Sequence, residues 1–143
     1  MKPERVFADT NLFLRYLTDD VPEQADAVER LFRRAAAGEM ALVTNELVIA
    51  EIVWTLESFY RLPRHEIKDK VLAILNTPGL EIAYGDIVLQ AITWYAEKNG
   101  DLIDAHNAAW MLTQDMRTVY TFDRRHFVRL EGVTVKVPGE EMS

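Results

Sequence analysis

The stretch VFADTNLFL at residues 6–14 changes abruptly from an apolar run to a carboxylate and two small polar residues. The run predicts a strand that ends at Asp9, followed by a helix for which Thr10 and Asn11 are suitable N-terminal residues. In open α/β sheets, ligands bind at the edge formed by the carboxyl ends of the strands. Asp9 is therefore either a simple helix cap or a functional carboxylate. Other carboxylates later in the chain help to decide between these two roles.

Composition limits the class of protein. The chain has 143 residues, 49% of them hydrophobic and 27% charged, which is typical of a single globular domain spanning residues 1–143. The absence of cysteine excludes disulfides and thiolate chemistry, so any metal must be held by oxygen or histidine. A net charge of −7 argues against a protein that coats nucleic acid with a basic surface. With no apolar run long enough to span a membrane and no signal-peptide core, we expect a cytoplasmic protein without membrane association.

Apolar periodicity predicts strands that alternate with helices. We expect strands ending at residue 9, at 40–44, 80–83, 117–122 and 133–137, and helices at 10–17, 22–37, 46–59, 64–76, 86–98 and from 101 onward. The helices at 46–59 and 64–76 form a hairpin, because only a short turn separates them. This order predicts an α/β fold with three layers, α/β/α, around a central parallel sheet of about five strands.

Some apolar residues receive specific predictions from this pattern. Tyr16 belongs to the expected buried side of the first helix, and Leu47 and Phe59 belong to the apolar set of the hairpin. Trp54, Phe59 and Tyr60 make the hairpin tip unusually aromatic. Core packing and an interface are both consistent with that composition.

Three further carboxylates follow the pattern of Asp9. Asp123 ends the strand at 117–122, Glu51 lies about two turns into the long helix, and Asp104 lies in the first turn of a late helix. Parallel strands place their carboxyl ends at one edge, which the helices bearing Glu51 and Asp104 also approach. Two of these acids also have a simpler explanation, since Glu51 could face solvent and Asp104, together with Asp101, could complement a helix dipole.

Carboxylates held close together repel one another, and unless one becomes protonated they need a cation between them. A site made only of oxygen ligands suits Mg²⁺ or Mn²⁺. Such an ion orients a phosphodiester, lowers the pKa of an attacking water and stabilises the leaving oxygen. The four acids therefore predict metal-dependent phosphodiester hydrolysis.

At these residues the sequence resembles the PIN-domain nucleases. The resemblance is carried by Ala8-Asp9-Thr10-Asn11, by Glu51 in Asn45-Glu46-Leu47-Val48-Ile49-Ala50-Glu51-Ile52, by Leu102-Ile103-Asp104-Ala105 and by Thr121-Phe122-Asp123. Chain length and element order are most similar to the VapC-type toxins of toxin–antitoxin pairs. The resemblance implies an endoribonuclease that uses one or two Mg²⁺ or Mn²⁺ ions.

The resemblance also implies roles for individual residues. Asp9 and Asp104 would be direct metal ligands, Glu51 a ligand or a base acting on water, and Asp123 a second-site or water-mediated ligand. Accessory roles fall to four residues near these acids: Asp101, Thr10, Asn11 and Thr121. RNA phosphates would meet the basic patch formed by Arg124, Arg125 and His126, unless that patch is only a solvated helix start.

Partners follow from the same resemblance. Family toxins are usually homodimers that cleave RNA and are silenced by a small antitoxin. The tail of that antitoxin packs on the helical hairpin, and a basic side chain enters the acidic site. The aromatic hairpin tip is compatible with such a partner.

Other functions that begin from an aspartate after a strand have different sequence requirements. A haloacid-dehalogenase-like phosphatase needs a second aspartate two residues after the first, where this chain has Asn11. A receiver domain needs a lysine after a late strand, and here that strand ends in Asp123. A catalytically silent PIN-like module that binds RNA or protein, and a housekeeping RNA-processing PIN nuclease, remain as alternatives to a toxin.

Overall fold

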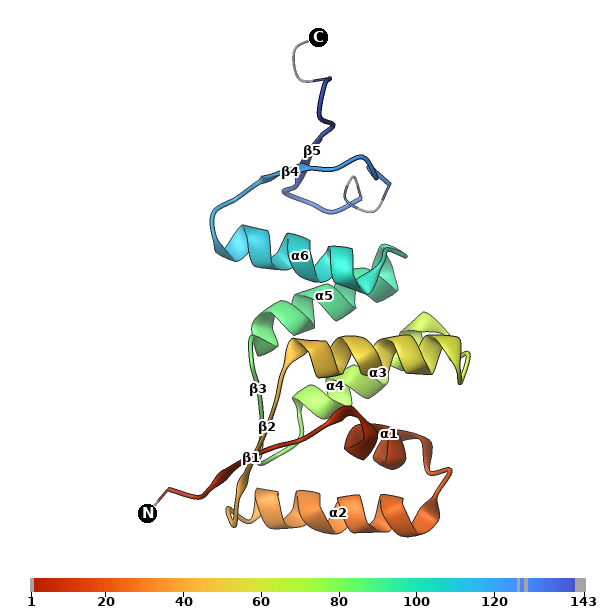
Figure 1. Cartoon of the computed structure of the whole chain (residues 1–143), viewed down its shortest axis with the longest axis vertical. Helices are drawn as coiled ribbons and strands as arrows, with labels where there is room; N and C mark the ends of the chain where they lie inside the picture. The colour runs from red at the N-terminus through yellow and green to blue at the C-terminus, as the bar shows by residue number, and fades with distance from the viewer. Residues whose placement is uncertain (1, 126, 128, 141–143) are drawn as a thin grey trace. The chain divides into compact units, whose positions relative to one another are not determined.

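The computed structural model describes residues 2–125, 127 and 129–140 (Figure 1). The chain divides into two compact units, Met1–Gly85 and Asp86–Ser143. Each unit has its own parallel strands and its own helices.

The first unit contains a three-stranded sheet and four helices. Its elements are β1 (Arg5–Phe7), α1 (Thr10–Thr18), α2 (Pro22–Ala36), β2 (Ala41–Thr44), α3 (Glu46–Ser58), α4 (Arg64–Leu75) and β3 (Leu80–Ile82). The strands are parallel in the order β1-β2-β3, with Arg5 opposite Ala41 and Leu42 opposite Leu80. Helix α1 contacts α2 and α3, and α3 lies beside α4 as the predicted hairpin (Figure 1).

Apolar burial stabilises this unit. Its most deeply buried side chains come from α1, β2 and both hairpin helices: Phe13, Leu42, Ile49, Ile52, Leu56, Ile67 and Val71. Three residues expected in the apolar sets are instead exposed, namely Tyr16 at 44%, Leu47 at 77% and Phe59 at 74%. Helix α3 is apolar on nearly every side, so periodicity alone could not identify the side that packs against its neighbours. The expected burial of Tyr16 was wrong, and Leu47 and Phe59 belong to the apolar set of the hairpin without being buried.

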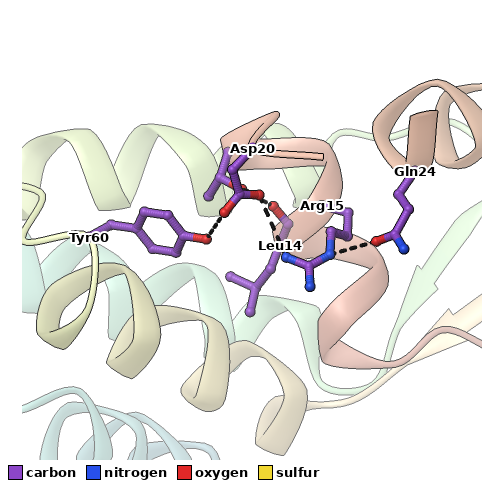
Figure 2. Close-up of polar contacts among 6 residues, drawn as sticks. Leu14, Arg15, Asp20, Gln24 and Tyr60 are labelled. Carbon is purple, nitrogen blue, oxygen red and sulfur yellow. Dashed lines mark hydrogen bonds and ion pairs between the residues drawn. The ribbon is translucent and has the colours of Figure 1, made fainter. Parts of the chain in front are cut away.

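A polar cluster around Asp20 ties the α1–α2 connection to the hairpin tip (Figure 2). The Tyr60 hydroxyl donates to Asp20 Oδ2 at 2.6 Å, and the Thr18 hydroxyl donates to Asp20 Oδ1 at 2.9 Å. Arg15 Nη1 lies 3.6 Å from Asp20 Oδ1, while its Nε donates to Gln24 Oε1 at 2.7 Å. The pKa of Asp20 is lowered, first by the bond from Tyr60 and then by the bond from Thr18, because both stabilise the ionised carboxylate.

Gly79, in the turn before β3, allows a very close approach between this turn and α2. Its φ is +81°, and a Cβ atom built there would lie 2.4 Å from the carbonyl carbon of Ala35. Any side chain at this position would overlap the helix backbone and also strain the turn. The glycine of this turn is therefore required by both conformation and space.

The described part of the second unit contains two helices and two strands: α5 (Gly85–Glu97), whose first residue is the last of the first unit, α6 (Leu102–Thr113), β4 (Thr118–Tyr120) and β5 (Thr134–Lys136). The strands pair in parallel, with Thr118 opposite Thr134. The core joins both helices to the segment between the strands through Ile87, Ala91, Trp94, Ala105, Ala108, Ala109, Phe127 and Leu130. Valines from the strand region, Val119, Val133 and Val135, pack against this cluster.

The predicted fold class is confirmed in its main features. The chain is α/β, its five described strands all pair in parallel, and the hairpin is present. The strand count of the main sheet differs from the expectation, because the described strands form one sheet of three and one of two. Alternating apolar residues identify a strand but not its pairing partner, and β4 and β5 bond to each other. Among the described residues, none of the helices combines the length and the apolar character that a bilayer crossing requires.

Candidate active site

Asp9 lies immediately beyond β1, at the carboxyl end of the first strand. Its backbone is extended, with φ −90° and ψ 166°, and its carbonyl oxygen accepts a hydrogen bond from the Leu12 amide at 3.2 Å. Asp9 is thus the N-cap of α1 by position. Its carboxylate is exposed and accepts no capping hydrogen bond. The capping interpretation therefore fails for the side chain, which stays available for another ligand.

Two other helices of the chain have working side-chain caps. Asn45 Oδ1 accepts from the Val48 amide at 3.1 Å at the start of α3. Asp101 Oδ1 accepts from the amides of Ile103 at 2.8 Å and Asp104 at 3.2 Å at the start of α6. These bonds satisfy amides that would otherwise have no partner within the helix. Asp101 therefore has a structural role as a cap.

Thr10 connects the Asp9 turn to the hairpin. It is the first residue of α1, its side chain is buried, and its hydroxyl donates to Glu51 Oε1 on α3. Glu51 is exposed, as expected for a glutamate that faces solvent. Its Oε1 nevertheless accepts a hydrogen bond from the Thr10 hydroxyl. Glu51 is thereby fixed beside the residue that follows Asp9. Asn11 lies exposed in the same first turn of α1.

Thr44 is a residue to which the sequence pattern assigned no function. It ends β2, is 1% exposed, and its hydroxyl donates to the carbonyl oxygen of Ala8 at 2.9 Å. Ala8 directly precedes Asp9. The only signal in the sequence was a hydroxyl at the end of an otherwise apolar strand, which is equally typical of a helix start.

In the second unit, Asp104 lies half-buried in the first turn of α6, with its amide bonded to Asp101. Asp123 follows β4, and its amide donates to the Thr121 hydroxyl at 3.0 Å. The structure therefore joins Thr121 to Asp123 in one tight turn.

The basic patch beside Asp123 is engaged with acidic residues. Arg125 Nε lies 3.6 Å from Asp123 Oδ1, and Arg124 Nη1 lies 4.0 Å from Glu140 Oε2. Both pairs are exposed, so they are weak and can exchange for other anions. His126 lies outside the described residues. Contact between this patch and RNA stays a prediction.

The structure thus joins candidate residues in three groups: Thr10 with Glu51 beside Asp9, Asp101 with Asp104, and Thr121 with Asp123. Over the described part of the chain, neither unit by itself holds three histidine or acidic side chains grouped to bind a metal ion. A joint site of Asp9, Glu51, Asp104 and Asp123 stays a prediction. The oxygen donors present, above all the exposed Asp9 carboxylate, suit a hard divalent cation.

Comparisons with known proteins identify the family of this chain. A family model described as the PIN domain matches residues 6–133, a range that includes all four candidate acids. A relative, the VapC ribonuclease of Aquifex aeolicus (strain VF5), is 29% identical over 133 residues, which cover 93% of this chain and 96% of that protein. The resemblance seen in the sequence motifs is confirmed, and the chain belongs to the PIN-domain family.

Proposed function

We propose that this chain is a metal-dependent endoribonuclease that hydrolyses RNA phosphodiester bonds, and that it is the toxin of a type II toxin–antitoxin pair. Family membership and similarity to a protein named VapC ribonuclease over 93% of the chain support this function. The observation that carries it is the state of Asp9. This residue occupies the ligand-binding end of a parallel strand, and its carboxylate makes no capping bond.

Four carboxylates would hold Mg²⁺ or Mn²⁺ in this function: Asp9, Glu51, Asp104 and Asp123. When bound, such an ion would orient the phosphodiester, lower the pKa of the attacking water and stabilise the leaving oxygen. Asp9 and Asp104 would serve as direct ligands, and Asp123 would act at a second site or through water. Glu51 serves as a ligand or accepts the proton of the attacking water, in an orientation that the Thr10 hydroxyl maintains.

The whole of residues 1–143 acts in this proposal as one cytoplasmic nuclease domain. RNA is the substrate, with Arg124 and Arg125 meeting its phosphates by exchanging their weak ion pairs. The protein forms a homodimer and binds a small antitoxin at the hairpin. Trp54 and Phe59, which are 68% and 74% exposed, supply apolar surface for such partners.

The test is cleavage of a pool of cellular RNA by purified, antitoxin-free protein with Mg²⁺, with Mn²⁺ or with a chelator. Wild type should produce discrete fragments only when metal is present. Asp104→Asn should lower the rate by about a hundredfold or more, because it removes a charge from the proposed metal ligands.

A matched control is Asp115→Asn, the same chemical change at an exposed residue with φ 59°, a conformation that asparagine tolerates. This variant should cleave like wild type. The proposed function is wrong if wild type cleaves nothing under any metal, or if Asp104→Asn retains full activity.

A further inference from the structure

Two buried hydroxyls belong to, or bond to, the residues next to Asp9 in the chain: Thr10 follows Asp9, and Thr44 bonds to Ala8, which precedes it. Thr10 and Thr44 are the buried polar residues of the described chain, at 4% and 1% exposure. A buried hydroxyl without a partner is unfavourable, so each must form a hydrogen bond within the protein. Thr10 bonds forward to Glu51, and Thr44 bonds to the residue that precedes Asp9.

Strand β2 holds both backbone polar groups of Ala8. The Ala8 amide donates to the carbonyl of Val43 at 2.8 Å, and the Ala8 carbonyl accepts from the Thr44 hydroxyl at 2.9 Å. Ala8 itself is fully buried. The paired residues of β1 and β2 end with Phe7 opposite Val43. The bond from the Thr44 hydroxyl therefore connects β2 to a residue beyond the end of β1.

The bonded carbonyl belongs to the same rigid peptide plane as the Asp9 amide. Because a peptide bond is planar, holding the Ala8 oxygen fixes the plane from which the Asp9 Cα projects. We propose that Thr44 is a positioning residue for the Asp9 carboxylate and acts through the Ala8 carbonyl. This inference rests on the proposed function, in which Asp9 is a metal ligand.

The choice of residue type supports a role beyond packing. Valine has nearly the same shape as threonine and an equal preference for strands, and its second methyl group adds apolar burial. A hydroxyl at a position that is 1% exposed gains nothing from solvent. Its contribution lies in the bond to Ala8, which orients the peptide next to Asp9.

The experiment compares Thr44→Val, which removes the hydroxyl, with Thr44→Ser, which keeps it. Metal-dependent cleavage of RNA should show a kcat about tenfold or more below wild type for Thr44→Val, with KM nearly unchanged, since a misplaced catalytic group affects the transition state most. Thr44→Ser should restore kcat to within about threefold of wild type. Thr77→Val, which removes a threonine hydroxyl bonded to the Ala73 carbonyl at 2.7 Å, is the matched control and should leave kcat unchanged.

A second readout does not depend on catalysis. The Mg²⁺ concentration that half-shifts the ¹³C signal of the Asp9 carboxyl group should rise about tenfold in Thr44→Val and stay unchanged in Thr44→Ser and Thr77→Val. If Thr44→Val fails to fold, Thr44→Ala replaces it, because Ala and Ser differ at this position only by the hydroxyl.

Each outcome decides one of the two claims. If wild type cleaves RNA but Thr44→Val equals it in both kcat and Mg²⁺ midpoint, the positioning role is wrong and the nuclease function stands. A lower melting temperature with an unchanged kcat also overturns it, because that result describes a purely structural threonine. If wild type neither cleaves RNA nor responds to Mg²⁺, the proposed function fails, and the role of Thr44 fails with it.

Discussion

Asp9 and Asp101 occupy the same position relative to a helix, yet the structure uses their carboxylates differently. Both precede the first residue of a helix with an extended backbone. Asp101 accepts hydrogen bonds from two backbone amides, whereas the Asp9 side chain accepts none from α1. A carboxylate that completes a helix stabilises the fold, and one that does not is available for a ligand. Local sequence cannot separate the two cases, because aspartate is a favoured cap in both.

The sharpest test of this comparison is the effect of asparagine at each position on RNA cleavage. Asp9→Asn should lower the cleavage rate by about a hundredfold or more, since it removes a charged metal ligand. Asp101→Asn keeps an effective capping group and should stay within about fivefold of wild type. Initial rates at saturating Mg²⁺ measure both. Equal losses of cleavage rate in the two variants would place Asp101 in the catalytic site. The two aspartates would then not differ in function.

A second test concerns the hydroxyl that follows Asp9. Thr10→Val should lower kcat by about tenfold, because it releases Glu51 from its hydrogen bond while keeping the shape of the buried side chain. Thr10→Ser retains the donor and serves as the control. Identical rates for all three proteins would show that the contact has no part in catalysis.

For the free energy of unfolding, we expect the opposite order: substitution of Asp101 should have a larger effect than substitution of Asp9. Asp101→Ala should lower the free energy of unfolding by about 1 kcal/mol, because it leaves two helix amides without their acceptor. Asp9→Ala should change it by less than about 0.5 kcal/mol, the scale of a charge near a helix dipole. Urea unfolding followed by circular dichroism measures both values. A larger loss for Asp9→Ala would mean that its carboxylate has a structural partner after all.

The smallest expected effect concerns Asp20, an acid that resembles Asp101 in having donors around it. Its pKa is lowered in the folded protein, first by the Tyr60 hydroxyl, so its contribution to stability is fully present above its unfolded pKa of about 3.9. The contribution is lost as the pH falls through the lower folded value. Tyr60→Phe should therefore melt about 1–2 °C below wild type at pH 7, as expected for an exposed interaction.

At a pH below the folded pKa of Asp20, the melting temperatures of Tyr60→Phe and wild type should converge. Thermal unfolding at a series of pH values tests this. A difference that persists unchanged at acidic pH would mean that the Tyr60 hydroxyl stabilises the fold by some route other than its bond to the ionised Asp20 carboxylate.

The sequence allowed much of the local structure to be predicted. Apolar periodicity located the helices and the strands, and the strand preceding Asp9 ends where the apolar run stops. It could not predict that β4 pairs with β5, or that Leu47 and Phe59 are exposed, because both depend on contacts between distant segments. The role of Thr44 was hidden for the same reason, since its acceptor lies 36 residues away in the chain.

The sequence identified the residues of the candidate site but not the hydrogen bonds and ion pairs that their side chains make. Acidic residues at strand ends and helix starts can be recognised by their place in the pattern. Whether each side chain caps a helix, pairs with an arginine or stays available depends on a few ångströms of backbone geometry. For example, the Asp123 carboxylate lies 3.6 Å from Arg125, so a substitution of Arg125 would remove this ion pair.

Gly79 has a consequence for how this sequence can change over evolutionary time. Gly38 has a similar backbone conformation, with φ +86°, but nothing lies within 4 Å of the Cβ that a mutation would add. A substitution there meets only local backbone strain, whereas one at Gly79 collides with the backbone of α2. Position 38 can therefore drift among residues that tolerate a left-handed turn. Position 79 is closed to every single substitution unless α2 shifts at the same time, so the spacing between that helix and the turn should be inherited as one unit.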